Sequence, residues 1–186
     1  KRIVILNFPN NPTGYTVTEA EAQAIRKVLV AAADAGNDIV VVIDDAYFGL
    51  VFEKGILGES MFSLLANAHE RILAVKLDGP TKEDYVWGFR IGFVTFGTAR
   101  WTPALYGALE SKLGGAIRGN ISNCSNLRQT MLLVAYAHAG YDAEKAAKYT
   151  ILKRRYERVR DTFAAHAEYR KYFSPLPFNS GYFMCI

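Results

Sequence analysis

The sequence predicts an α/β protein in which helices flank a mostly parallel β-sheet. Up to about residue 98, short apolar runs alternate with amphipathic stretches, a pattern typical of parallel strands joined by helices. Clusters rich in Gly, Pro and Asn separate these elements and indicate loops. The chain has 186 residues, of which 51% are apolar and 22% charged, so it is large enough to bury a core.

In the first half, four apolar runs read as strands, namely Ile3–Leu6, Ile39–Ile43, Ile72–Leu77 and Ile91–Phe96. The continuous β-branched run at 39–43 predicts a strand covered on both faces. Thr18 and Glu21 form a capping box that opens a helix ending near Gly36. Its predicted core positions are Ile25, Val28, Leu29 and Ala32. Met61–Ala66 predicts a second, short helix.

The second half is mainly helical. Thr102 and Pro103 are an N-cap and first-turn pair for a helix to about Leu113. We expect Ser125 to cap a helix ending at residues 138–140, and Asp142 to cap a long one. The long helix has an apolar seam of Tyr149, Leu152, Tyr156, Val159 and Phe163. A last strand is expected from Gly181, and we place a domain change between segments 1–145 and 146–186.

Composition excludes several classes of protein. No apolar run approaches the roughly 20 residues that span a bilayer. Cys124 and Cys185 form no framework, which indicates a reducing cytoplasm, and three scattered histidines argue against a metal site. The net charge is only +4, and the basic stretch 153–160 reads as a solvated helix face rather than a nucleic-acid surface. Because the chain begins and stops inside apolar runs, we expect it to be truncated at both ends.

Polar side chains follow three of the predicted strands, and each segment offers different chemistry. The stretch 7–14 offers an amide, 44–47 a carboxylate and a phenol, and 78–90 an amine and a guanidinium. Ligands of open parallel sheets bind beyond the carboxyl ends of the strands. Together these groups describe a site for an aromatic aldehyde that also carries a phosphate and a ring nitrogen. Lys76 is an alternative to Lys82 as the lysine that supplies the amine, but it lies inside an apolar strand.

The chain resembles the fold-type I, pyridoxal-phosphate-dependent class I/II aminotransferases. The motifs that carry the resemblance are Asn11-Pro12-Thr13-Gly14, Asp44-Asp45-Ala46-Tyr47, and Lys82 with Gly88-Phe89-Arg90-Ile91-Gly92. They occur in the family's order and at about its spacings. The resemblance implies that residues 1–145 are part of a pyridoxal-phosphate-binding large domain. Residues 146–186 would be a linking helix and the start of a small α+β domain.

The resemblance also implies a role for each matching residue. Lys82 would form the Schiff base with pyridoxal phosphate and move the proton of the substrate α-carbon. Asp44 would pair with the ring nitrogen, and Asp45 would point away. Tyr47 and Asn11 would hydrogen-bond the phenolic oxygen, while Arg90 and Thr81 would bind the phosphate. The family often has a serine where this chain has Gly79.

A further match concerns Arg118, which precedes a Ser-Asn pair by four residues. In dicarboxylate-specific members such an arginine reaches into the neighbouring subunit's site and binds the distal carboxylate. The other interpretation is an exposed arginine near a helix end. Arg118, with Asn11, is therefore a candidate substrate residue, and an acidic amino acid is a candidate substrate.

The expected function is transfer of an amino group between an amino acid and a 2-oxo acid, by a homodimer in the full-length protein. Taken alone, the fragment is expected to be inactive, because upstream and downstream site residues of the family lie outside it. Two alternatives stay open. One is a pyridoxal-phosphate-dependent lyase or decarboxylase of the same fold. The other is an aminotransferase-like sensor module of a transcription regulator.

Overall fold

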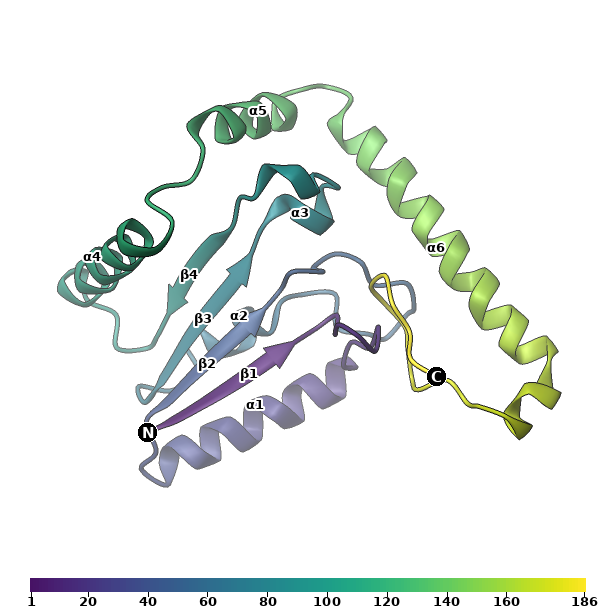
Figure 1. The fold of residues 1–186 in the computed structure, drawn as a ribbon. Helices are drawn as coiled ribbons and strands as arrows, with labels where there is room; N and C mark the ends of the chain where they lie inside the picture. The colour runs from purple at the N-terminus through teal and green to yellow at the C-terminus, as the bar shows by residue number, and fades with distance from the viewer.

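The computed structural model describes residues 1–186 and has a four-stranded sheet of order β1-β2-β3-β4 at its centre (Figure 1). The strands are β1 (Arg2–Asn7), β2 (Ile39–Asp44), β3 (Ile72–Asp78) and β4 (Phe93–Gly97). The first three run parallel, whereas β4 pairs antiparallel with β3. The predicted mostly parallel sheet is confirmed.

One face of the sheet is covered by α1 (Glu19–Asp34) and α2 (Met61–Leu65) (Figure 1). The predicted capping box forms, because Thr18 Oγ1 accepts from the Glu21 amide and the Glu21 carboxylate accepts from the Thr18 amide. Val28 was wrongly placed in the core, since its exposed fraction is 67%. The buried positions of α1 are Ala22, Leu29 and Ala33, and Val28 lies about 100° round the helix from Leu29.

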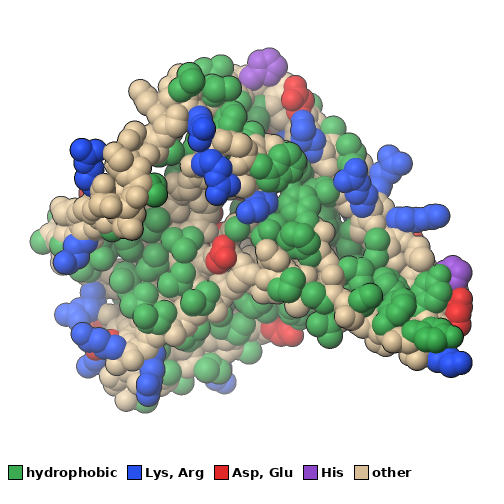
Figure 2. Space-filling view, viewed as in Figure 1, with side chains coloured by type: hydrophobic (Ala, Val, Ile, Leu, Met, Phe, Trp, Pro, Cys, Tyr) green, Lys and Arg blue, Asp and Glu red, His purple; other side chains and the backbone are tan.

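The other face of the sheet is largely open. Ile3 and Ile5 on β1 are 75% and 69% exposed. On β2, Val40 and Val42 are only half-buried, so the prediction of a strand fully covered on both faces is wrong for this face. Figure 2 views this face, where apolar side chains gather and Lys and Arg lie around them. The helix α4 (Pro103–Asn120) reaches it only beside β4, where the Tyr106 hydroxyl donates to the Phe96 carbonyl.

The second half contains α3 (Pro80–Glu83), the 3-10 turn η1 (Trp87–Phe89), α4, α5 (Asn126–Tyr136), α6 (Tyr141–Ala165) and the 3-10 turn η2 (Ala167–Lys171). The predicted end of α4 at Leu113 is wrong. The helix continues through Gly114 and Gly115 to Asn120, because a helical glycine costs only about 1 kcal/mol. Asp142 is not a cap either, since Gly140 occupies the N-cap position and makes no side-chain bond.

No strand forms over Gly181–Ile186, contrary to the prediction. Ser180 makes one isolated bridge with Val51, and the Gly181 amide donates to the Leu50 carbonyl. The backbone of this C-terminal segment bonds to loops rather than to a neighbouring strand, so no ladder can extend.

The long helix α6 packs on the loops beyond the sheet. Its buried Tyr156 joins Tyr47, Leu50 and Phe52 in a second apolar cluster. From the predicted seam, Tyr149 and Leu152 pack there as well, while Val159 is partly exposed. Because α6 is continuous, the boundary placed after residue 145 falls inside a helix, and the two-domain division stays a prediction. None of the helices combines the length and the apolar composition needed to cross a membrane.

Candidate active site

The three segments that carry the predicted chemistry lie at one edge of the sheet. In the strand register, Asn7 of β1 pairs with Asp44 of β2, and Asp44 pairs with Leu77 of β3. The parallel strands therefore end side by side. The turns that follow them begin at the same level, which is the carboxyl edge where open sheets bind ligands.

A cavity of about 460 Å³ opens at this edge. Four predicted site residues line it, namely Asp44, Thr81, Lys82 and Arg90. Its apolar wall comes from Leu77 and Val94 on the open face of the sheet and from Leu113, Ile117 and Ile121 at the end of α4. A carboxylate, an amine and a guanidinium thus share one partly apolar hollow, which suits a planar ligand with charged ends.

Tyr47 and Asn11 do not line this cavity themselves. Tyr47 contacts Lys82, which does, and Asn11 bonds to Tyr47. The Lys82 Nζ lies 5.2 Å from the centre of the Tyr47 ring, and Asn11 Nδ2 donates to the Tyr47 hydroxyl at 3.4 Å. Burial raises the pKa of the Tyr47 phenol, so the hydroxyl stays protonated at neutral pH. Asn7 holds Asn11 in place, since its Oδ1 accepts the Asn11 amide at 2.9 Å.

The two adjacent aspartates point to opposite faces of the sheet, as strand alternation requires. Asp44 is half-buried, lines the cavity and accepts the Ala46 amide at 3.1 Å. Asp45 is 3% exposed, and its Oδ2 has no hydrogen-bond partner. Burial raises the pKa of the Asp45 carboxyl to about 6, against the opposing effects of a hydrogen bond with Ser60 and of Lys76, whose Nζ lies 3.8 Å away.

The competing lysine, Lys76, lies on the side of Asp45 and does not line the cavity. Its ammonium pairs with Asp78 at 2.5 Å and sits over the ring of Phe48. Burial by itself would lower the pKa of Lys76, but Asp78 and Asp45 outweigh it and raise that pKa. Lys76 is therefore held in its charged, non-nucleophilic form.

Gly79 has a packing reason to be glycine. A Cβ at this position would lie 2.6 Å from the Ile91 carbonyl oxygen, where a real side chain would clash. The serine that the family resemblance expects here therefore does not fit this backbone. Thr81 lies in the cavity lining and can offer its hydroxyl instead. Arg90 is exposed and adopts a left-handed backbone conformation, with φ 54°.

Arg118 is not brought to the cavity. It is exposed on the last turn of α4 and donates to the Ser122 hydroxyl at 2.9 Å, although its neighbour Ile117 lines the cavity. Its predicted part in a neighbouring subunit's site stays a prediction.

Sequence reasoning missed the C-terminal segment as a support of the site. The Tyr182 hydroxyl donates to the Lys82 carbonyl at 3.0 Å, and its ring contacts that of Tyr47. Asn179 exchanges two hydrogen bonds with the Thr16 backbone, both at 2.9 Å. A signal in the sequence was Gly14, where a Cβ would lie 1.9 Å from the Phe183 carbonyl. A glycine at such a spot indicates that another backbone passes close by.

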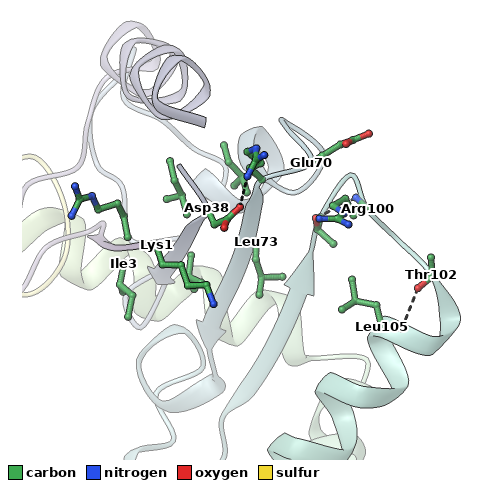
Figure 3. A pocket seen from close by; sticks show the side chains of 14 residues that line it. Lys1, Ile3, Asp38, Glu70, Leu73, Arg100, Thr102 and Leu105 are labelled. Atoms are coloured by element: carbon green, nitrogen blue, oxygen red, sulfur yellow. Dashed lines mark hydrogen bonds and ion pairs between the residues drawn. The ribbon is translucent and has the colours of Figure 1, made fainter. Parts of the chain in front are cut away.

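A larger hollow than the candidate cavity lies elsewhere, at the amino ends of the strands (Figure 3). It measures about 780 Å³ and contains none of the predicted site residues. Its charged rim is partly self-paired, since Arg71 binds Asp38 at 2.8 Å. With no convergent catalytic groups, it is not the candidate site.

Comparison with known proteins gives one family. The family model described as aminotransferase class I and II matches residues 1–186. An LL-diaminopimelate aminotransferase of Methanococcus maripaludis is 33% identical over 95 residues, 50% of this chain and 20% of that protein. An aspartate aminotransferase of Bacillus sp. YM-2 is 30% identical over 93 residues, 50% of this chain and 21% of that protein.

Solved structures share the fold over nearly the whole chain. An aminotransferase of Anaerococcus prevotii superposes with a TM-score of 0.79 at 22% identity, covering 98% of this chain and 44% of that one. An aromatic-amino-acid aminotransferase of Burkholderia pseudomallei, described as covalently bound to pyridoxal phosphate, superposes with a TM-score of 0.66 at 22% identity. It covers 86% of this chain and 38% of that one. The chain therefore spans less than half the length of these proteins.

Proposed function

The chain belongs to the class I and II aminotransferases, and from this membership we propose that it carries the reactive lysine of a pyridoxal-phosphate-dependent transaminase. The whole protein would transfer an amino group between an amino acid and a 2-oxo acid. The observation that carries the proposal is the single cavity shared by Lys82, Asp44 and Arg90, in a chain matched by the family model from end to end.

The residues at the cavity fit pyridoxal phosphate in chemical kind. The group needs an amine for its aldehyde, an acid for its ring nitrogen and cations or hydroxyls for its phosphate. Lys82, Asp44, Arg90 and Thr81 supply these around one hollow of about 460 Å³. That volume is within the range of roughly 300–1,000 Å³ for small-molecule sites. The apolar wall from Ile117 and Ile121 suits the flat ring.

Each of these side chains has a defined task in the proposed reaction. Lys82 would attach the cofactor and, once the amino substrate displaces it, carry the proton removed at the substrate α-carbon. Asp44 would keep the ring nitrogen protonated. Tyr47 and Asn11 would hydrogen-bond the phenolic oxygen, and Arg90 with Thr81 would hold the phosphate. When bound, pyridoxal phosphate supplies the electron sink that stabilises the substrate carbanion.

The proposal specifies the substrate and the assembly of the whole protein in less detail than the reaction. The names of the related proteins include diaminopimelate, aspartate and aromatic aminotransferases. These names therefore do not indicate which side chain the amino-acid substrate of this protein carries. An acidic substrate follows only from the predicted role of Arg118. We also propose a homodimer in the cytoplasm for the whole protein.

A half-reaction distinguishes the proposal from its alternatives. We would load the full-length protein with pyridoxal phosphate and add a panel of amino acids without any 2-oxo acid. A transaminase converts the bound cofactor to pyridoxamine phosphate once and then stops, as the absorbance spectrum shows. Continued release of product without acceptor would identify a lyase or decarboxylase. Promoter binding without either change would identify a regulator.

A further inference from the structure

The short helix α3 carries Lys82 and does not support itself. It has four residues, Pro80–Glu83, too few for more than one turn of internal hydrogen bonds. Tyr85 follows it with φ 61°, in the left-handed region that residues other than glycine rarely adopt. Something outside this segment must therefore hold Lys82 toward the cavity.

Besides the Tyr182 hydroxyl on the Lys82 carbonyl, holding contacts come from α5 and α6, whose adjoining ends lie beside α3 (Figure 1). Asp84 is the centre of these contacts, with a side chain only 5% exposed. It accepts hydrogen bonds from the Tyr136 hydroxyl at 2.7 Å and from the Tyr141 hydroxyl, and it pairs with Lys145 at 3.0 Å. Tyr136 ends α5, while Tyr141 and Lys145 lie in the first turns of α6.

The helix α6 also contacts Glu83, the residue between Lys82 and Asp84. Lys145 Nζ donates to the Glu83 carboxylate at 2.7 Å. One ammonium on α6 therefore bridges two consecutive acids, and these acids follow the reactive lysine directly in the chain. Charge-assisted bonds of this kind are about twice as strong as neutral ones.

The electrostatics of the cluster match a bond that persists at neutral pH. Burial alone would raise the pKa of Asp84, but the bonds from Tyr141, Tyr136 and Lys145 outweigh it and hold that pKa below its ordinary value. Burial and the bond to Asp84 raise the pKa of the Tyr141 phenol to about 12. Both groups therefore keep the charge states that the contacts require.

We propose that Asp84 is a positioning residue, which fixes α3 through Tyr136, Tyr141 and Lys145 so that Lys82 faces the cavity. The inference rests on the proposed function for the role of Lys82, but the contact itself does not depend on it. As a consequence, the start of α6 and the reactive lysine move as one unit. A displacement of α6 reaches Lys82 through Asp84.

The test uses the full-length protein with the substitution D84N, which keeps the shape of the side chain and removes its charge. The matched control is D142N, an identical chemical change at an exposed position in the first turn of α6. Y141F is a second, milder variant that removes one hydroxyl. Hydrogen–deuterium exchange of peptides covering residues 80–86 is measured without cofactor, and the dissociation constant of pyridoxal phosphate is measured separately.

For D84N we expect the exchange rate over residues 80–86 to rise on the order of tenfold. A rise of this size corresponds to losing the stabilisation that a hydrogen bond to a charged group provides. The dissociation constant should rise several-fold, with D142N equal to wild type in both readouts. Y141F should show smaller changes in the same direction, and it decides the question should D84N not fold. Unchanged exchange in both D84N and Y141F overturns the proposal. Failure of wild-type Lys82 to bind pyridoxal phosphate overturns the proposed function instead, and exchange still decides the role of Asp84.

Discussion

The hydroxyl of Tyr182 donates a hydrogen bond to the main-chain carbonyl of Lys82 at 3.0 Å, between residues 100 positions apart in the sequence. Burial raises the pKa of the Tyr182 phenol, so this donor stays protonated. The C-terminal segment therefore supports the loop that carries the candidate reactive amine.

Replacing Tyr182 by Phe removes that donor and leaves the Lys82 carbonyl without this partner. We expect a loss of about 1 kcal/mol in the free energy of unfolding, measured by urea titration. Tyr172→Phe is the control, because Tyr172 is 77% exposed. Equal stabilities of the two variants would show that the Tyr182 contact contributes nothing.

Replacing Lys82 by Ala should abolish covalent attachment of pyridoxal phosphate. Borohydride treatment of the full-length protein followed by peptide mass spectrometry detects the fixed cofactor. Lys76→Arg serves as the control, because it keeps the charge that pairs with Asp78 and Asp45. Cofactor fixed to the Lys82→Ala protein at wild-type yield would rule out the assignment of Lys82.

Replacing Gly79 by Ala should destabilise the protein by about 1–3 kcal/mol, the usual cost of overpacking. The added Cβ would meet the Ile91 carbonyl at 2.6 Å, and backbone cannot rotate away as a side chain can. Gly88→Ala, in the same loop, is the control because no atom lies within 4 Å of its added Cβ. Thermal unfolding of both variants gives the comparison.

Replacing Asp45 by Asn should stabilise the protein at neutral pH. The folded-state pKa of about 6 lies above the ordinary value of 3.8, so the folded protein binds this proton more tightly than the unfolded chain. The contribution of Asp45 to stability therefore falls as the pH rises from about 4 to about 6, and above that it is fully unfavourable. The shift corresponds to about 3 kcal/mol at most.

The measurement is the difference in unfolding free energy between Asp45→Asn and wild type from pH 4 to pH 8. We expect the advantage of the variant to be small at pH 4 and to level off above pH 6. A difference that does not change with pH would show that Asp45 keeps its ordinary pKa.

Replacing Thr18 by Ala should cost about 1 kcal/mol, because the capping box at the start of α1 loses its hydroxyl. Ser125→Ala is a suitable comparison, since Ser125 occupies the N-cap of α5 without a side-chain cap bond. Chemical denaturation should show a loss for Thr18→Ala and almost none for Ser125→Ala. The reverse order would contradict the capping geometry.

The local pattern predicted the strands well and the helix ends poorly. An apolar run such as Ile72–Leu77 predicts a buried strand without further information, because the strands that neighbour it in the sheet are apolar runs too. The end of α4 depended on whether Gly114 and Gly115 stop a helix, which the residues around them decide. The last strand was missed because pairing requires a partner, and the backbone of that segment bonds to loops instead.

What the sequence determined by itself is the kind and order of the chemical groups, with an amide, an acid, a phenol, an amine and a guanidinium after successive strands. Strand alternation was enough to separate Asp44 from Asp45. Only the tertiary structure decided which groups share a cavity and that Asp84 and Tyr182 hold the loop of Lys82. The reason is that contacts across 50 to 100 residues follow from how whole elements pack, which no short stretch of sequence encodes.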